Sequence, residues 1–523
     1  MKRSDLLSAV VLAVSTATST GCGRTAHGPT IDASPSVSFR VSLTSPQRLL
    51  DMVFMIDNSG MASRVTKMTA QFSRLIAALK DQNDGTLPDL RIAIIDSDLG
   101  TGGAYSSGSC SPKTLADGTV SRYGDLGRFQ MPNASNCGVT SADAQWLEFT
   151  KGLPTNFTGD INVVFACLAN NLGTQGCGYQ HQLQAFEFAL VAKGYGNEGQ
   201  RQMLRPNAQL ALFLITEEDD CSAATNDGMF GDKDELGGES ASLRCATRAH
   251  QCNGINLTTP PPGYPTSASF SAPFSTCAAR TDACPSALDG DTATDTSQPT
   301  ECSPLRSVKR MADGIKSLKA NPNDQILVAG IFGWPLSDED IATATYKIAP
   351  VPNPNAADTS HPTAFDLWPI CYDPGRKPVN NTDFDSAVAG MGAAPGLRLS
   401  AFVDEFGENG LKFSICQSDF TATMSQIGAK LAQQVSSQYN RCLPASFAQY
   451  KNCTAQYLVP DPDNSTGYSR QADAVTSCDA SPKMPSCYTL VPDAPPCATG
   501  EFLVQGDSGS ALPRGTLLEF TCQ

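Results

Sequence analysis

Histidine is scarce in this chain, and paired metal-ligating cysteines are missing from it. Four histidines occur among 523 residues, at positions 27, 181, 250 and 361, and no Cys-x-x-Cys pair is followed by a second. A zinc–thiolate site needs such ligands at close spacing, so we expect no site of this class. Beyond the N-terminus, no apolar run is long enough to cross a bilayer as a helix. The body of the protein is therefore expected to be soluble.

An excess of basic residues is also absent. The formal net charge is −15, and an acidic surface argues against nucleic acid and anionic lipid headgroups as partners. The Gly-x-Ser-x-Gly elbow, the His-Glu-x-x-His motif and a phosphate-cradling loop are missing from suitable contexts. We therefore expect a protein that is not an enzyme and that does not bind nucleic acid.

The first residues predict export. Basic residues precede a mostly apolar run over residues 6–14, and small residues lead up to Cys22. This order resembles a bacterial lipoprotein signal, although Ser19 stands where such signals usually carry leucine. The resemblance implies removal of residues 1–21 and a lipid on Cys22 as the only membrane contact. The polar residues 22–47 predict a flexible stalk. We expect an outer-membrane or cell-surface lipoprotein, with the periplasm or plain secretion as alternatives.

The other cysteines predict an oxidised framework. Nineteen cysteines less Cys22 leave eighteen, an even number, which in an exported chain indicates disulfides rather than free thiols. Spacing favours local pairs of Cys110 with Cys137 and of Cys167 with Cys177. The remaining connectivity stays open, because sequence alone does not determine it.

Apolar runs alternate with helical periodicity along most of the chain. Helical spacing follows Gly60, recurs over residues 161–168 and 180–191, and starts again near Ser303 and Ser418. Strands are expected at 52–56, 90–95, 210–215, 325–332 and 412–415. This alternation predicts an α/β fold with a mainly parallel sheet. The family resemblance of the motif at residues 57–61, given below, implies that this sheet is doubly wound and Rossmann-like.

Long polar segments interrupt the alternation. The α/β domain is expected to cover residues 48–435, with disulfide-braced insertions at 101–158, 221–302 and 335–396. Residues 436–523 contain six cysteines and little helical periodicity. They predict a small cysteine-rich module that is β-rich or irregular.

The most informative segment follows the first expected strand. It places Asp57, Ser59 and Gly60 directly before an amphipathic helix. Hard oxygen ligands at the end of a buried parallel strand suit magnesium, manganese or calcium. Glu217 follows the strand at 210–215, and neighbouring strands at the switch point of such a sheet direct their loops into one crevice. The sequence therefore predicts an anionic pocket that favours a divalent cation.

The motif around Asp57 resembles that of a known family. Residues 57–61, Asp-Asn-Ser-Gly-Met, resemble the motif Asp-x-Ser-x-Ser of von Willebrand factor A-type domains. Over about residues 48–435, the chain also resembles the cysteine-rich exported or lipoprotein A-domain proteins of myxobacteria and relatives. The segments that carry this closer resemblance are 98–102, 176–181, 216–222 and 414–420.

The resemblance implies a metal site completed by a threonine and a second carboxylate. Thr174 is the first choice for the threonine, and the region of Gln180 is an alternative. Glu217 takes the place of the family's aspartate, and Met61 takes the place of its second serine. A hard cation does not choose a thioether, so the implied site is either occupied with one ligand fewer or degenerate.

The resemblance also implies an adhesion-type protein. Its partner would be a protein, engaged through a metal-bridged carboxylate or through the insertion loops. One alternative is a metal-independent scaffold of the envelope or matrix. A less favoured alternative is a phosphatase-like hydrolase with Asp57 as nucleophile, although that chemistry needs a second aspartate where Ser59 stands.

Ordinary structural roles are alternatives for several of these residues. Asp57 could cap the helix that follows it, and Glu218 and Asp219 could belong to a solvated loop. Residues 220–222, Asp-Cys-Ser, are expected to anchor a disulfide-bonded loop. His181 stands at a helix start and is expected at the surface or as a cap.

Overall fold

The computed structural model describes part of the chain. The described residues are 37–42, 48–81, 87–102, 108–115, 118–193, 197–223, 229–230, 241–252, 255–256, 277–284, 302–336, 348–352, 363–367, 369–372, 392–437, 442–450, 452–461, 464, 466–478, 486–493, 497, 500–508 and 516–522. Cys22 and the expected signal peptide lie outside them. Among the described residues, no helix combines the length and the apolar character needed to cross a bilayer.

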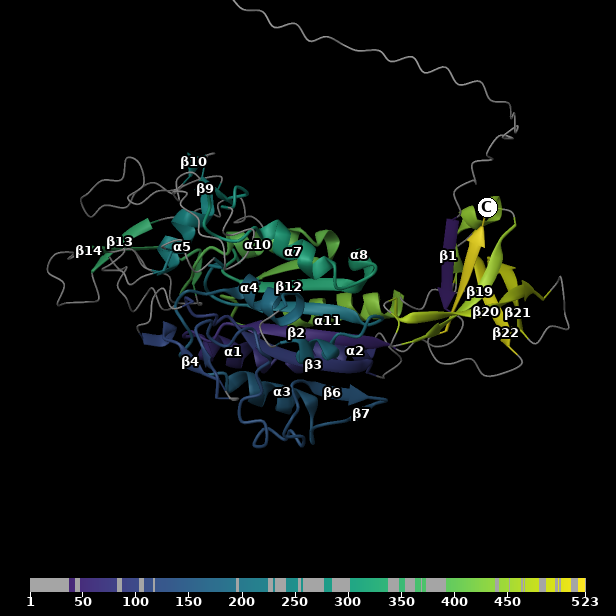
Figure 1. Ribbon diagram of the computed structural model, residues 1–523, viewed down its shortest axis with the longest axis horizontal. Coiled ribbons are helices and arrows are strands. Elements are labelled where there is room, and N and C mark those ends of the chain that lie inside the picture. The colour runs from purple at the N-terminus through teal and green to yellow at the C-terminus, as the bar shows by residue number, and fades with distance from the viewer. Residues whose placement is uncertain are drawn as a thin grey trace, which may run out of the picture.

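A seven-stranded sheet forms the centre of the larger unit (Figure 1). Its strands, in order across the sheet, are β17 (Gly410–Ser414), β12 (Ile326–Phe332), β8 (Gln209–Ile215), β2 (Leu49–Ile56), β3 (Asp89–Asp96), β6 (Leu147–Thr150) and β7 (Leu153–Pro154). The first five are parallel, and β6 and β7 are antiparallel. All five strands expected from the sequence are confirmed, because continuous apolar runs suit strands that are buried on both faces.

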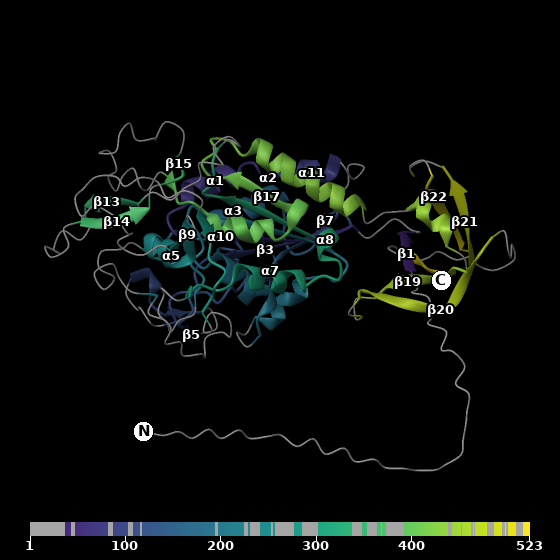
Figure 2. The same cartoon turned by 90° about the horizontal axis from the view of Figure 1, so that it is seen from above.

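Helices cover both faces of this sheet (Figure 2). One face carries α1 (Ala62–Thr69), α2 (Phe72–Asp81), α3 (Ile161–Asn170) and α11 (Thr421–Ser437). The other carries α4 (Gln182–Phe186), the π-helix η2 (Glu187–Val191), α7 (Val308–Lys316) and α10 (Leu397–Asp404). On the first face, Phe54 stacks on Phe213 with ring centroids 4.0 Å apart. The fold is therefore a mixed α/β architecture with one core on each side of the sheet.

Two details of the helices differ from the sequence expectation. The helix expected from Ser303 starts later, with Ser307 as its cap, and the Ser307 hydroxyl accepts a hydrogen bond from the Arg310 backbone at 3.4 Å. Ser303 instead donates its hydroxyl to the carbonyl of Arg248 at 3.0 Å. The helix expected over residues 180–191 changes from α to π at Glu187. Apolar periodicity locates the buried face of a helix, but it does not determine the residue at which the helix starts or a change from α- to π-helix.

The segments between the main strands contain short elements. They are η1 (Gly108–Cys110), β4 (Lys113–Thr114), β5 (Val120–Ser121), η3 (Glu198–Met203), α5 (Ala241–Ala249), β9 (His250–Cys252), β10 (Ile255–Asn256), β11 (Cys277–Ala279), α8 (Pro322–Gln325), β13 (Ile348–Pro352), β14 (Thr363–Leu367), β15 (Cys371–Tyr372), β16 (Gly392–Ala393) and η5 (Gly407–Asn409).

Disulfides brace these segments, but the two pairs favoured by spacing are wrong. Cys110 is bonded to Cys177, and Cys137 is bonded to Cys167. The fold brings the distant segments together, so closeness in sequence is a poor guide to pairing. Further disulfides join Cys221 to Cys245, Cys284 to Cys302 and Cys371 to Cys416.

The C-terminal module is a second, disulfide-stapled sheet, as the sequence predicts. Its strand order is β1 (Val37–Ser42), β23 (Leu517–Cys522), β19 (Thr454–Pro460), β20 (Tyr468–Ser477), β21 (Ser486–Pro492), β22 (Phe502–Ser508) and β18 (Cys442–Leu443), with the short helix η6 (Ala445–Gln449) beside it. Disulfides join Cys442 to Cys497, Cys453 to Cys522 and Cys478 to Cys487. In Figure 1 the module lies beside one end of the α/β unit.

Strand β1 corrects one sequence expectation. Residues 37–42 were expected within a flexible stalk, whereas they pair in antiparallel register with β23. Val41 is buried in the core of the module, and Phe39 packs on Phe447 and Tyr450 with ring centroids 5.3 Å apart in each pair. The alternation of Val37, Phe39 and Val41 with polar residues is the sequence signal for this half-buried strand.

Candidate functional site

Asp57 lies at the carboxyl end of β2, beside the neighbouring strand β8. The register of β2 with β8 confirms that the strands before Asp57 and Glu217 are neighbours. The backbone N–H of Asp57 donates to the carbonyl of Ile215 at 2.9 Å. Gly60 turns the chain away with a φ of +81°, a conformation that glycine adopts without strain. The motif therefore stands at the edge of the sheet where the sequence places it.

The carboxylate of Asp57 is buried and surrounded by hydrogen-bond donors. Its Oδ1 accepts from the backbone and hydroxyl of Ser59, each at 2.9 Å, and from the hydroxyl of Ser97 at 3.4 Å. Its Oδ2 accepts from the hydroxyl of Thr216 at 2.7 Å. The residue is 1% exposed, and burial raises the pKa of its carboxyl although the hydrogen bonds from Thr216 and Ser59 oppose that shift.

Ser59 makes contact with the segment that contains the expected threonine. The side-chain amide of Gln180 donates to the Ser59 hydroxyl, and the Ser97 hydroxyl donates to Oε1 of Gln180 at 2.6 Å. Thr174 is exposed, and its hydroxyl accepts from the side chain of Gln175 at 3.4 Å. Of the two positions that the sequence left open, Gln180 is the one in contact with Ser59.

Glu217 follows β8, and its side chain forms an ion pair with Arg64 of α1. The Arg64 side chain is 4% exposed and that of Glu217 is 19% exposed. Arg64 Nη2 also donates to the carbonyl of Gly392 at 3.1 Å, and the backbone carbonyl of Glu217 accepts from the Ala394 N–H at 2.8 Å. Glu217 therefore lies beside the motif, with an arginine as its partner.

Arg64 and Thr216 are contacts that the sequence analysis missed. Thr216 directly follows an apolar strand and belongs to the segment 216–222 that carries the family resemblance, but the sequence alone assigned no role to its hydroxyl. Arg64 lies on the buried face of α1 together with Val65 and Met68. A charged residue at a position of helical apolar spacing is the signal that could have identified it, because buried arginine needs a partner.

Met61 is buried, as a residue that has lost a ligand role would be. It is 1% exposed, belongs to the core on the α1 side of the sheet and precedes the first turn of α1. Its carbonyl accepts from the backbone N–H groups of Arg64 at 2.9 Å and Val65 at 3.1 Å. Its thioether fills space in the apolar core, where it offers nothing that a hard cation prefers.

As arranged, the expected ligand set does not fit a divalent cation. The oxygens of Asp57 and Ser59 are engaged by hydroxyl, amide and backbone donors, Glu217 faces a guanidinium, and Thr174 is exposed. In the part of the chain that the structure describes, one other trio of metal-ligating side chains converges, Cys442, Cys497 and Glu501. Its two cysteines are joined in a disulfide, so that trio does not fit a metal either.

The acidic run after β8 has a structural role beyond Glu217. Both carboxylate oxygens of Asp219 accept from the backbone N–H of Arg398 at 3.1 Å, at the N-terminal end of α10. His250 Nε2 lies 3.2 Å from Asp219 Oδ2. Asp219 is therefore a buried cap of α10, not a residue of a solvated loop.

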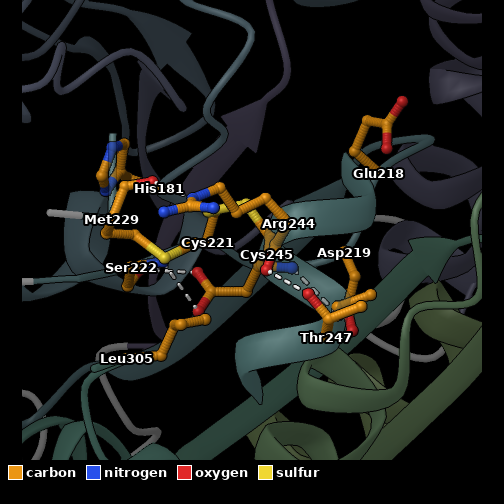
Figure 3. Close-up of a disulfide and its surroundings, with 12 residues drawn as sticks. His181, Glu218, Asp219, Cys221, Ser222, Met229, Arg244, Cys245, Thr247 and Leu305 are labelled. Carbon is orange, nitrogen blue, oxygen red and sulfur yellow. Dashed lines mark hydrogen bonds between the residues drawn. A yellow bond between two sulfur atoms is a disulfide. The ribbon is translucent and has the colours of Figure 1, made fainter. Parts of the chain in front are cut away.

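The next part of this run contains Asp220 and Cys221, and Figure 3 shows the disulfide between Cys221 and Cys245. Asp220 accepts from the backbone N–H of Leu183 at the start of α4 at 3.0 Å, and from Arg398 Nε at 3.1 Å and Nη2 at 2.9 Å. Cys221 is bonded to Cys245 of α5, and the Ser222 hydroxyl donates to Asp220 at 2.6 Å. The anchoring role expected for residues 220–222 is confirmed.

His181 differs from its expected place at the surface. It stands at the N-terminal boundary of α4 but is 2% exposed, and its side chain makes no capping hydrogen bond. Its ring lies 5.5 Å from that of Phe230, and burial lowers the pKa of its imidazole. The insertion after β8 covers a residue that would otherwise lie at the edge of the sheet.

Comparisons with known proteins give only weak likenesses. No family model matches the chain, and no curated protein matches it. Solved structures that resemble it include the pilus adhesin SpaC from Lactobacillus rhamnosus GG, in its open conformation, with 9% identity, a TM-score of 0.27 and coverage of 93% of this chain and 40% of that one. A von Willebrand factor type A structure from Catenulispora acidiphila has 9% identity, a TM-score of 0.23 and coverage of 93% and 60%.

The pilus adhesin RrgA from Streptococcus pneumoniae has 11% identity, a TM-score of 0.22 and coverage of 93% of this chain and 58% of that one. The chain thus spans between 40% and 60% of the length of these solved structures. TM-scores of this size do not establish a common fold.

Proposed function

We propose that this chain is an exported, lipid-anchored and non-enzymatic binding protein of the adhesion type, whose α/β unit is a von Willebrand factor A-type domain that engages a protein partner. The observation that carries the proposal is the strand order. If the two-residue edge strand β7 is left out, the strands β2, β3, β6, β8, β12 and β17, numbered in chain order, lie across the sheet as 3-2-1-4-5-6, and the third is antiparallel. That order is the doubly wound arrangement, in which ligands bind where neighbouring loops diverge at the switch point.

The disulfides support an exported location. They occur in the insertions of the α/β unit and in the C-terminal module, and such bonds persist in oxidising compartments. A lipid on Cys22 would then hold the protein at the outer membrane or cell surface.

The surroundings of Asp57 support binding rather than catalysis. A nucleophilic aspartate needs a carboxylate that a substrate can reach, whereas this one is buried and accepts hydrogen bonds at both oxygens. The described ends of two insertions, residues 221–223 and 392–394, lie at this edge of the sheet, and the insertions would supply the surface for a partner. An envelope scaffold remains the second candidate, because the same disulfide-braced insertions suit a purely structural role.

The binding proposal is tested with the purified full chain in detergent, labelled and applied to an array of extracellular proteins. We expect saturable binding that unlabelled protein displaces and that a chelator leaves unchanged. No saturable binding to any array protein would favour the scaffold. In bacterial cells, we expect Cys22→Ala to abolish incorporation of labelled fatty acid, and retained labelling would contradict the lipid anchor.

A further inference from the structure

The cation beside Glu217 comes from the protein itself. Arg64 Nη1 pairs with Glu217 Oε2, and both side chains are largely shielded from water. Glu217 Oε1 lies next to Gly60, because a Cβ added at that glycine would stand 3.5 Å from it. The guanidinium thus neutralises the second carboxylate of the predicted pocket at the point where that carboxylate meets the Asp57–Gly60 turn.

The position of Arg64 is fixed from two directions. It lies in the first turn of α1, where its backbone N–H donates to the carbonyl of Met61 at 2.9 Å. Its Nη2 donates to the carbonyl of Gly392 in β16 at 3.1 Å. A guanidinium has several donors in a rigid planar group, so one arginine can serve a carboxylate and a carbonyl together.

The segment that Arg64 contacts covers the same edge of the sheet. Ala394 N–H donates to the Glu217 carbonyl at 2.8 Å, and β16 pairs with β15. Cys371 of β15 is bonded to Cys416, which lies just after β17. The end of the third insertion is therefore fastened over the switch point by a disulfide, a strand pair and the Arg64 side chain.

We propose that Arg64 is the resident cation of this crevice, and that its guanidinium takes the role that a divalent ion would have beside Glu217. Arginine keeps its charge at every pH that proteins tolerate, so the site is neutralised without a supply of metal. A divalent ion next to a guanidinium would be repelled, and Met61 offers it no oxygen. This role of Arg64 is a property of the chain itself and does not depend on whether the protein binds a partner.

The test is metal titration of the full chain by calorimetry and thermal unfolding, with magnesium, manganese and calcium chlorides against a chelator. For the wild type we expect no saturable heat and no change in Tm with any of the three ions. For Arg64→Ala we expect a lower Tm in chelator. We expect the ions to raise this Tm by several degrees, because the guanidinium charge next to Glu217 has been removed. The double variant Arg64→Ala/Met61→Ser should respond to lower ion concentrations, since it regains a hydroxyl.

Matched variants separate this role from general loss of packing. Lys67→Ala removes an exposed positive charge from the same helix and should show no metal response. Arg64→Lys keeps the charge and should also stay insensitive to metal. If Arg64→Ala does not fold, Arg64→Gln decides, because it removes the charge but keeps a polar side chain with an amide donor.

Two results would overturn the proposal. One is a saturable metal signal in the wild type that disappears in Glu217→Gln, because the crevice would then hold a metal despite Arg64. The other is a folded Arg64→Ala or Arg64→Gln variant that responds to metal no better than the wild type.

Discussion

Asp57 illustrates how a conspicuous residue can oppose stability at neutral pH. Because burial raises the pKa of its carboxyl, the folded protein holds a proton at pH values where the unfolded chain has lost it. The folded state is thus favoured at low pH, and this contribution is lost as the pH rises from the ordinary pKa of 3.8 through the higher pKa of the folded protein. Above that higher pKa the ionised carboxylate is a net cost.

We therefore expect Asp57→Asn to raise the free energy of unfolding at pH 7. An asparagine can still accept from Ser59 and can donate to the Thr216 hydroxyl, which can turn to the Glu218 carbonyl 3.3 Å away. Urea unfolding at pH 5 and pH 7 measures the difference, which should grow with pH.

Asp57→Ala is the control for this experiment. It removes the acceptor of the Ser59 backbone N–H and hydroxyl and should cost about 1–3 kcal/mol. An asparagine variant that is less stable than the wild type at pH 7 would show that the ionised carboxylate is favoured after all.

Individual residues of the candidate site were partly predictable. Asp57 and Ser59 were identified because they directly follow an apolar strand. Residues so close to the end of a strand must lie at the carboxyl edge of the sheet. Gln180 and Arg64 depend on how a distant loop and a helix face pack against the motif. Sequence spacing carries no information about such long-range contacts. Arg64 therefore needed the structure, and the region of Gln180 was named only as an alternative that the family resemblance implied.

At the scale of the elements, α10 depends on a buried ion pair. Its first residues include Arg398, which is buried, pairs with Asp220 and donates Nη2 to the carbonyl of Arg306 at 2.8 Å. Asp220 also receives the N-terminal N–H of Leu183 in α4. One carboxylate thus links two helices on the same face of the sheet.

Asp220→Ala should therefore destabilise the α/β unit by about 3–5 kcal/mol, because it leaves the Arg398 guanidinium buried and unpaired. Chemical denaturation measures the loss. Asp313→Ala is the matched control: Asp313 pairs with exposed Lys309 on α7, and exposed pairs of this kind contribute little. A loss for Asp220→Ala no larger than for the control would mean that Arg398 finds another partner.

The elements themselves show where sequence patterns succeed. Four of the parallel strands were predictable, since each is a short apolar run that is largely buried on both faces. The fifth, β17, is an edge strand that is mostly half-buried and contains Lys412, so its pattern is weaker. The antiparallel strands β6 and β7 were not predictable, because they lie inside a polar insertion at the sheet edge. The start of α7 was misplaced by four residues because Ser303 and Ser307 are both good caps.

At the scale of the whole molecule, the module is built from both ends of the described chain. Strand β1 precedes the α/β unit, whereas the other strands of that sheet follow it. Removal of residues 1–42 should therefore open the module and leave the α/β unit folded. Limited proteolysis should then cleave within residues 442–522 faster than in the full chain.

Phe39→Ala tests the same dependence without a truncation. It removes the ring that packs on Phe447 and Tyr450, and it should speed cleavage of the module in the same direction but less strongly. If both variants resist protease as the full chain does, β1 does not hold the module together.

The place of β1 also determines how the protein would carry mechanical load. For a chain tethered at Cys22, as proposed, a pull on the α/β unit runs lengthwise through β1 before it reaches the larger sheet. A strand already rises about 3.3 Å per residue and a fully stretched chain at most about 3.6 Å, so peeling these six residues away lengthens the tether by only about 2 Å. Because the tether lengthens so little when β1 detaches, the applied force does little work in detaching it. The strand thus behaves as an almost inextensible connection, whereas a coiled or helical linker would lengthen under tension.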